Sequence, residues 1–203
     1  MRPLFRLTQG LDLVLASASP RRRQFLSEWG VPFVVRPVAG EPDAVAGESA
    51  LDFVQRCAAF KMQAARGADR EVVVAADTVV ALEGRIMGKP ADDDEALDML
   101  QALSGRSHQV ITAVALSFPD QTSLVQCDTC DVHFAPWSRA VLQAYVATGE
   151  CSDKAGAYAI QGCGAFLADR IDGCWSTVVG LPVSWLAAEL VQRGLLEPLP
   201  AGN

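Results

Sequence analysis

The sequence predicts a mixed α/β protein in which an elongated sheet is flanked by helices. A buried strand at residues 13–17 leads directly into a helical segment. Residues 71–76 form a near-continuous apolar run, which is typical of a central strand. Two long extended segments, 108–118 and 124–134, lie on either side of a Pro-Asp-Gln turn and predict a hairpin. Strands and helices alternate over most of the chain, which favours the α/β class.

The first helix has clear start and stop signals. Ser19 is a good N-cap, because its hydroxyl can accept from the free N–H groups of the first turn. Pro20 suits the first helical position, where no N–H partner is needed. Gly30 is the expected C-terminal stop.

The remaining elements follow from periodicity and breakers. The apolar run at 71–76 is expected to end at Asp77-Thr78. In the helix expected at 50–66, Leu51, Val54 and Met62 should lie near one face, together with Cys57 and Ala58. Other helices are expected at 92–103, 138–148 and 182–193, and other strands at 33–38, 79–82, 85–87, 164–171 and 175–179.

Composition limits the function. The chain has 203 residues, half of them apolar, and a net charge of −7. We expect one domain over residues 1–203, with 1–10 and 197–203 at its periphery. The acidic balance argues against a general nucleic-acid surface, so any anion site must be local. No apolar run approaches the length of a membrane span, and we expect a cytoplasmic protein with no membrane or nucleic-acid partner.

The six cysteines do not indicate a small secreted protein held together by disulfide bonds, because the chain is too long and too apolar. Cys127 and Cys130 match the C-x-x-C spacing once. They fall in an extended segment, where positions three apart point to opposite faces. Buried free thiols are therefore the expected state, and a zinc or redox site is the lesser alternative.

A phosphate-type site is predicted where the first strand meets the first helix. Ser19 opens that helix, and Arg21, Arg22 and Arg23 follow in its first turn. Free N–H groups and guanidinium groups at a helix N-terminus suit a polyphosphate. A solvated basic face is the plain alternative. The arginines oppose the helix dipole, and a bound anion would relieve that repulsion.

Three further segments place polar groups beside turns. Asp77 follows a buried strand and could hold a metal or take a proton from water. Lys89 lies between a Gly and a Pro, which would hold it in a defined direction. In residues 153–162 small residues allow close approach of a ligand, and the Gln161 amide could pair with a base edge. Each has a plain alternative: a turn-capping acid, an incidental surface lysine and a loop that merely packs.

Six motifs follow one another along the chain. They are Leu15-Ala16-Ser17-Ala18-Ser19-Pro20-Arg21-Arg22, Ala76-Asp77-Thr78, Gly88-Lys89-Pro90, Leu103-Ser104-Gly105-Arg106-Ser107-His108-Gln109-Val110-Ile111-Thr112-Ala113-Val114, Asp153-Lys154-Ala155-Gly156-Ala157-Tyr158-Ala159-Ile160-Gln161-Gly162 and Val179-Gly180-Leu181-Pro182. The P-loop pattern is absent. Any one motif would be weak, but their order and spacing are specific, and over residues 13–195 they resemble the Maf family of nucleoside triphosphate pyrophosphatases.

The resemblance implies a fold of the Maf and inosine triphosphatase type, with two lobes around a central cleft. It implies cleavage of a nucleoside triphosphate to the monophosphate and pyrophosphate with a divalent cation, Mg²⁺ or Mn²⁺. It implies that Asp77 is the proton acceptor. By the same match, the residues that influence base choice would be Arg21, Thr78 and Gln161, and those around the phosphates would be Arg22, Lys61, Lys89 and Lys154.

This chain departs from the family pattern at two places. The family usually has consecutive acids after the second strand, one of which helps hold the metal. Here Pro42 separates Glu41 from Asp43, so Glu41 joins Asp77 as the expected metal ligand and Asp43 is the alternative. Before Lys61 the family often has Glu, where this chain has Phe60, which would alter how that lysine is oriented.

The Asp-Thr and Ile-Gln-Gly patterns resemble the branch of the family that acts on dTTP and UTP. The branch that prefers 7-methyl-GTP usually shows Asp-Gln and Ser-Glu-Gly. Two alternatives stay open: the same chemistry on 7-methyl-GTP or a modified pyrimidine nucleotide, and a nucleotide-binding regulator of cell division with little catalysis. A homodimer is implied by the resemblance alone.

Overall fold

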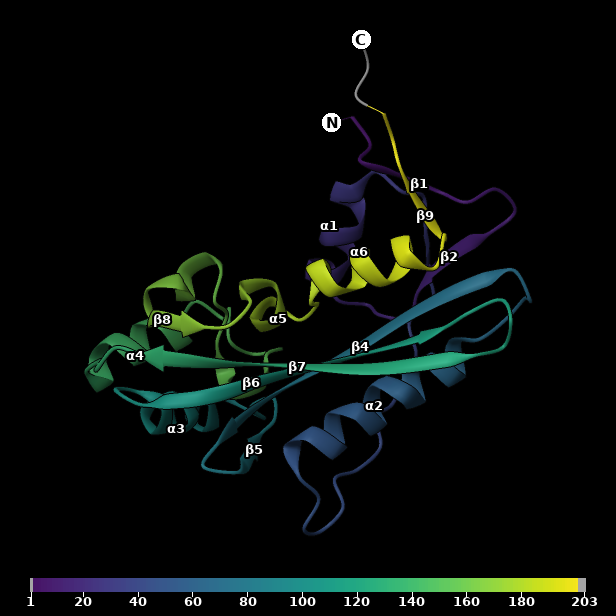
Figure 1. Ribbon diagram of the computed structural model, residues 1–203. Helices are drawn as coiled ribbons and strands as arrows, with labels where there is room; N and C mark the ends of the chain where they lie inside the picture. The colour runs from purple at the N-terminus through teal and green to yellow at the C-terminus, as the bar shows by residue number, and fades with distance from the viewer. Residues whose placement is uncertain (1, 201–203) are drawn as a thin grey trace.

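The computed structural model describes residues 2–200, which form a mixed sheet with helices on both faces (Figure 1). The strand order is β3-β2-β4-β6-β7-β8, and β5 pairs beside β4. Strand β2 is parallel to β3 and β4, and the other pairs are antiparallel. The strands are β2 Asp12–Leu15, β3 Val34–Val35, β4 Glu71–Leu82, β5 Arg85–Met87, β6 Ser107–Ser117, β7 Ser123–Phe134 and β8 Ala168–Asp172.

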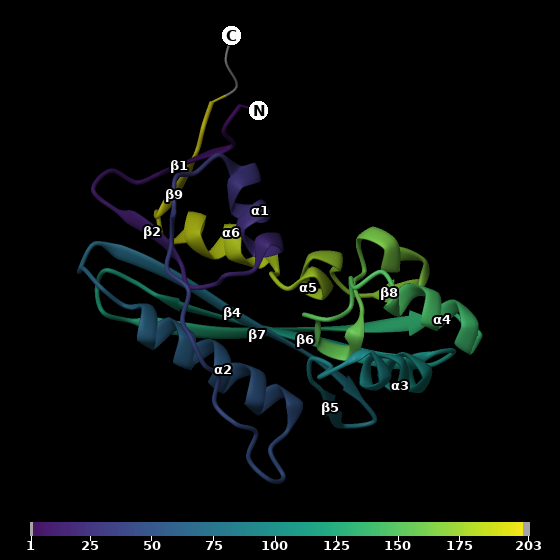
Figure 2. The same ribbon diagram turned by 180° about the vertical axis from the view of Figure 1, so that it is seen from behind.

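Helices pack on both faces of this sheet. Helix α2 lies along one face, and α1 and α6 cover the other face at the same end (Figures 1 and 2). Helices α3 and α4 lie at the far end, where they form a second lobe. The helices are α1 Pro20–Trp29, α2 Ala50–Ala65, α3 Asp93–Leu103, α4 Arg139–Val146, α5 Trp175–Val179 and α6 Val183–Gln192, with short 3-10 turns η1 Ala155–Ala157 and η2 Gly162–Phe166. The predicted α/β fold with two lobes is confirmed.

Strand β4 is the axis that both lobes share. Its odd-numbered apolar residues, such as Val73 and Val79, pack with α2. Its even-numbered residues face the opposite side, where Val74 packs in the core of α1 and α6 and Val80 packs in the core of α3 and α4. Side chains alternate between faces along a strand, so β4 contributes to all three apolar clusters.

The predicted helix starts are confirmed by their caps. The hydroxyls of Ser19, Ser49 and Ser138 and the Asp92 carboxylate accept from backbone N–H groups three residues ahead. Gly30 ends α1 in the left-handed conformation, at φ +74°. These local signals placed the helices correctly because capping depends on residues close in sequence.

Four expectations were wrong. Strand β4 does not end at Asp77, because β6 pairs with it without interruption from Val73 to Ala81. Residues 175–179 form helix α5 rather than a strand. Gly173, at φ +137°, turns the chain away from the sheet, and Gly180 ends helix α5 in the left-handed conformation. The strand expected at 164–171 starts only at Ala168, after η2. Leu51 lies away from the packed face of α2 and is 42% exposed.

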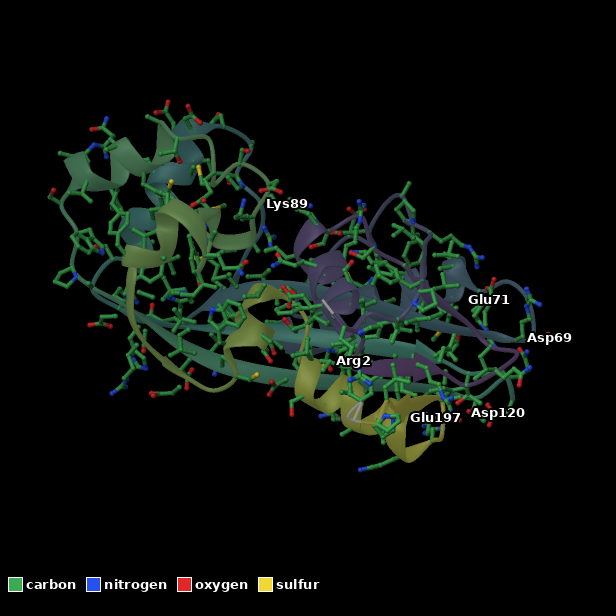
Figure 3. All side chains as sticks on the ribbon, turned by 90° about the horizontal axis from the view of Figure 1, so that it is seen from above. Arg2, Asp69, Glu71, Lys89, Asp120 and Glu197 are labelled. Atoms are coloured by element: carbon green, nitrogen blue, oxygen red, sulfur yellow. The ribbon has the colours of Figure 1, made fainter. Side chains whose placement is uncertain are left out.

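The segments expected at the periphery pair with each other. Strand β1 (Phe5–Leu7) and strand β9 (Leu196–Pro198) form a separate two-stranded antiparallel sheet. Figure 3 shows Asp69 and Asp120 at the same end of the molecule, where the loop before β4 approaches the β6–β7 turn. The predicted strand at 33–38 is reduced to Val34–Val35. Residues 1 and 201–203 lie outside the described part. Within residues 2–200, every helix is too short or too polar to cross a bilayer.

Candidate active site

A cleft of about 900 Å³ lies where β4 has a free edge. On this edge β2 pairs with β4 as far as Val74, and β5 joins only at Val80. Residues 75–79 therefore have no strand beside them on this edge. The cleft wraps around the free edge, so Asp77 and Thr78 both line it although their side chains point to opposite faces of the sheet. The predicted position of the acid at a strand end was wrong, but the chain does break its pairing there.

Peptide groups are presented at the same edge. The carbonyls of Arg70 and Val74 accept from the N–H groups of Asp12 and Ala16, so even-numbered residues direct their peptide groups toward β2. By this alternation the peptide groups of Ala76 and Thr78 face the cleft. Among residues 2–200 no hydrogen bond is formed by these groups on that side. The free edge thus offers donors and acceptors to a planar ligand.

Asp77 and Lys61 form a buried ion pair at the floor of the cleft. Lys61 projects from α2, and its Nζ lies 2.6 Å from Asp77 Oδ1 and 2.6 Å from Glu41 Oε1. The side chains of Lys61 and Asp77 are only 11% and 10% exposed. Asp77 Oδ2 has no hydrogen-bond partner in the described part of the chain, and solvent can reach this oxygen. One carboxylate oxygen is held by the ammonium, and the other faces the cleft.

The protonation of this cluster follows from burial and pairing. Burial raises the pKa of the Asp77 carboxyl, against the opposing effect of Lys61 and Arg22. Burial alone would lower the pKa of Lys61, but its two carboxylate partners raise it above its ordinary value. Burial acts to raise the pKa of Glu41, but the hydrogen bond and charge of Lys61, together with the charges of Lys89 and Arg22, lower that pKa below its ordinary value. The result is an ammonium between two carboxylates, in which burial raises the pKa of Asp77 and the surrounding cations lower that of Glu41.

Arg22 is held by three neutral oxygens. Its Nε donates to the Gly180 carbonyl at 2.7 Å, its Nη1 to Ser17 Oγ at 3.2 Å and its Nη2 to Thr78 Oγ1 at 3.0 Å. Burial lowers the pKa of the guanidinium below its ordinary value. A guanidinium has five N–H bonds, so two remain for a ligand. A half-buried cation whose partners are all neutral is a site prepared for an anion.

The other predicted residues also line the cleft, and they differ in whether their side chains already have hydrogen-bond partners. Arg21 and Lys89 line the cleft without a hydrogen-bond partner among residues 2–200. Figure 3 shows Lys89 on the side of the α3 and α4 lobe that faces helix α1. Lys154 also lines the cleft, but its Nζ donates to the Glu150 carbonyl at 2.5 Å and to Asp153 at 2.6 Å. Gln161 lines the cleft just before η2.

Ser19 has a structural task in addition to lining the cleft. Its Oγ accepts from the Arg22 backbone N–H at 3.5 Å, and its own N–H donates to Ser17 Oγ at 3.2 Å. The helix therefore begins at the predicted N-cap, while phosphate binding at this N-terminus stays a prediction. Arg23, from the same run, is exposed and does not line the cleft.

Three residues of the site were missed by sequence reasoning. Ser17, Thr112 and Gly180 all contribute to the network around Arg22 and Thr78. Each belongs to a motif that carried the family resemblance, so the motifs were the available signal. Nothing local in the sequence tells that Gly180 contacts Arg22, 158 positions away, or that Thr112 contacts Thr78, 34 positions away.

Two carboxylates are available for a divalent cation. Asp77 and Glu41 both reach the Lys61 ammonium, whereas Asp43 does not line the cleft and uses its carbonyl to accept from Arg56. Within residues 2–200 no group of three or more His, Cys, Asp or Glu side chains could hold a metal. Mg²⁺ is commonly held by one or two carboxylates together with substrate phosphates and water. The two carboxylates fit a cation whose remaining ligands come from a bound triphosphate and water.

Comparison with known proteins decides the family. The family model described as "Maf-like protein" matches residues 12–193. This chain belongs to the Maf family. A family relative from Oleidesulfovibrio alaskensis, named dTTP/UTP pyrophosphatase, is 49% identical over 195 residues, covering 94% of this chain and 89% of the relative. A second relative with the same name, from Nitratidesulfovibrio vulgaris, is 48% identical over 192 residues, covering 93% of this chain and 91% of the relative.

A solved structure is more distantly similar to this Maf-family chain. It is a crystal structure of a nucleoside-triphosphatase / dITP/XTP pyrophosphatase from Mycobacterium abscessus, with 16% identity and a TM-score of 0.45. The match covers 91% of this chain and 96% of that one. A likeness this distant adds no argument about the site.

Proposed function

We propose that this protein hydrolyses a nucleoside triphosphate to the nucleoside monophosphate and pyrophosphate, with dTTP and UTP as substrates. One observation carries the proposal: a buried carboxylate with one free oxygen shares a cleft with a guanidinium whose partners are all neutral. The first group can take a proton from water, and the second can bind phosphate. The names of the two relatives support the same reaction.

In the proposed mechanism Asp77 is the general base. Its free Oδ2 takes a proton from a water molecule as the water oxygen attacks the α-phosphorus. The bond from the α-phosphorus to the oxygen that bridges to the β-phosphorus breaks, and pyrophosphate leaves with the electron pair. Lys61 holds the other oxygen of Asp77 and so keeps the carboxylate oriented toward the attacking water. A raised pKa makes Asp77 a better base than an exposed aspartate.

The cations of the cleft would stabilise the leaving group. Arg22 is fixed in place, and Arg21 and Lys89 line the cleft without partners in the described part of the chain. Preorganised cations of this kind stabilise charge that develops in a transition state. A divalent cation held by Asp77 and Glu41 would neutralise phosphate charge and favour attack at phosphorus.

Base selection is proposed for the free edge of β4. Uracil and thymine carry two carbonyl acceptors with an N–H donor between them. The Ala76 and Thr78 peptide groups face the cleft with both donors and acceptors, and the Gln161 amide lines it. These groups can match the edge of such a base. The walls nearby include Val80, Val110 and Tyr158, which suit a planar ring.

The test is pyrophosphate release across a panel of nucleotides, with Mg²⁺, with Mn²⁺ and with chelator. We expect the highest kcat/KM for dTTP or UTP and a requirement for the metal. A higher kcat/KM for 7-methyl-GTP or for a modified pyrimidine nucleotide would overturn the substrate assignment but not the reaction. Nucleotide binding without pyrophosphate release would favour a regulator instead.

A cytoplasmic location and a homodimer are part of the same proposal. All six cysteines are free thiols in the structure, including the buried Cys57 and Cys151, which suits a reducing compartment. The mass of the protein in solution, measured by light scattering, tests the dimer, and fractionation of the source cells tests the location.

A further inference from the structure

A chain of three hydroxyl and carbonyl groups leads from the buried sheet to Arg22. Thr112, on β6, is fully buried, and its Oγ1 donates to the Thr177 carbonyl at 2.8 Å. Thr78 faces it from β4, with the two Oγ1 atoms 2.9 Å apart. Arg22 Nη2 lies 3.0 Å from Thr78 Oγ1.

The direction of every hydrogen bond in this chain is determined. A carbonyl can only accept, so Thr112 uses its one hydroxyl proton on Thr177. The bond between the two threonines must then be donated by Thr78, because Thr112 has no second proton. Thr78 is left with lone pairs alone for its other neighbours, and an arginine can only donate. The hydroxyl of Thr78 is thus fixed as an acceptor for Arg22.

We propose that Thr112 is a positioning residue for phosphate binding. Because Thr112 accepts the hydrogen bond from the Thr78 hydroxyl, a lone pair of Thr78 Oγ1 is directed toward Arg22. This contact orients the guanidinium so that its two remaining N–H bonds point into the cleft. Without the Thr112 hydroxyl, the Thr78 proton would be free to turn toward Arg22, where it would repel the cation. This inference rests on the proposed function, in which Arg22 meets the triphosphate.

The test uses variants of the full chain at two threonines of matched burial. Thr112→Val removes the hydroxyl with little change of volume, and Thr112→Ser restores it. Thr177→Val is the control, because it removes an equally buried hydroxyl, which donates to Asp128, and keeps the carbonyl that Thr112 uses. Two quantities are measured: the affinity for inorganic tripolyphosphate by calorimetry, without metal, and kcat/KM for UTP.

We expect Thr112→Val to weaken tripolyphosphate binding and kcat/KM by about tenfold each, the order of one hydrogen bond to a charged group. Thr112→Ser should stay within about twofold of the parent protein, and so should Thr177→Val. In a Thr78→Val background, which has no proton to direct, Thr112→Val should add less than about twofold. A merely structural role, in which the Thr112 hydroxyl only serves the Thr177 carbonyl, would also be rescued by Ser, but its effect would persist in the Thr78→Val background.

The outcomes separate this inference from the proposed function. Tripolyphosphate binding that is equal in the parent and in Thr112→Val overturns the inference, whatever the activity. A parent protein that binds tripolyphosphate but releases no pyrophosphate from any nucleotide overturns the proposed function, and the binding series still tests Thr112. A parent that does not bind tripolyphosphate overturns both. If Thr112→Val does not fold, Thr112→Cys, with a weaker donor and acceptor, takes its place with the same expected loss.

Discussion

The Lys61 ammonium lies 2.6 Å from Asp77 Oδ1, and both side chains are about nine-tenths buried. Between Val73 and Ala81, Asp77 is the one acid on the α2 face of β4, and Lys61 pairs with it from α2. A buried ion pair of this kind contributes little net stability, because the desolvation of both charges offsets their attraction. Its clearer effect is orientation, since it holds one carboxylate oxygen and leaves the other facing the cleft.

Asp77→Asn should abolish most turnover and preserve binding. The amide has nearly the same shape but cannot take a proton from water. We expect kcat for UTP to fall by about 10²–10⁴-fold, the usual contribution of a general base. The affinity for tripolyphosphate should stay within about threefold, because Arg22 is untouched. Stopped pyrophosphate assays and calorimetry measure the two quantities, and a variant that keeps its full kcat would contradict the assignment of Asp77.

Glu41 and Asp43 offer a matched pair for the metal. Only Glu41 reaches Lys61 and lines the cleft. We expect Glu41→Gln to raise the Mg²⁺ concentration for half-maximal activity by about 10–100-fold, as for loss of a metal-holding group. Asp43→Asn should leave it unchanged, because the carbonyl that accepts from Arg56 is retained. The measurement is a Mg²⁺ titration at saturating UTP. An equal effect of both substitutions would contradict the choice of Glu41.

The sequence was most informative where structure depends on near neighbours. The caps at Ser19, Ser49, Asp92 and Ser138 lie within one turn of their partners, and all four helices were correctly placed. The β6–β7 hairpin was also predictable, since alternation and its turn agree. Where distant pairing decides, the prediction was wrong: β6 extends β4 through Asp77, although the local sequence there reads as a strand end.

The site was predicted as a set of residues but not as an arrangement. The resemblance to the family identified Asp77, Arg22 and Lys61, which do line one cleft. It did not show that Arg22 would be held by neutral oxygens from residues 17, 78 and 180, because those contacts cross up to 158 positions of chain. Helix α5 was read as a strand for a related reason. Its β-branched residues favour a strand locally, and the flanking Gly173 and Gly180 decide otherwise.

His108 should make stability depend on pH. It is buried, its Nε2 pairs with the Tyr158 hydroxyl at 2.8 Å, and its Nδ1 has no partner in the described part. Burial lowers the pKa of His108 from 6.5 to about 4. The unfolded chain therefore binds a proton near pH 6.5 that the folded protein takes up only near pH 4. The contribution of His108 to the free energy of unfolding is complete above about pH 6.5 and falls as the pH drops to about 4.

The loss over that interval should be about 3 kcal/mol at most. Urea unfolding at pH 7, 5.5 and 4 measures it. The variant His108→Gln keeps a partner for Tyr158 but does not titrate, so it should lose less stability than the parent between pH 7 and pH 4. All other titrating groups are common to both proteins. Parallel curves for the two would contradict the pKa of His108.

Gly180 should be required for the arginine site as well as for the fold. It ends α5 at φ +113°, and a Cβ there would lie 3.2 Å from Thr78 Oγ1 and 3.5 Å from Arg22 Nη2. Gly194, after α6, also has positive φ, at +68°, but a Cβ there would meet nothing within 4 Å. Alanine at either position strains the backbone, so each substitution should lower the free energy of unfolding by about 1 kcal/mol or more.

Only Gly180→Ala should also weaken tripolyphosphate binding, by about tenfold, because the added methyl group crowds the Thr78–Arg22 contact. Calorimetry on both variants, at a temperature where both are folded, separates strain from crowding. Since Gly194 is remote from the cleft, its substitution reports backbone strain alone. Equal affinities in the two variants would mean that Arg22 tolerates displacement, and the guanidinium would then not be the fixed anion site that its three hydrogen bonds indicate.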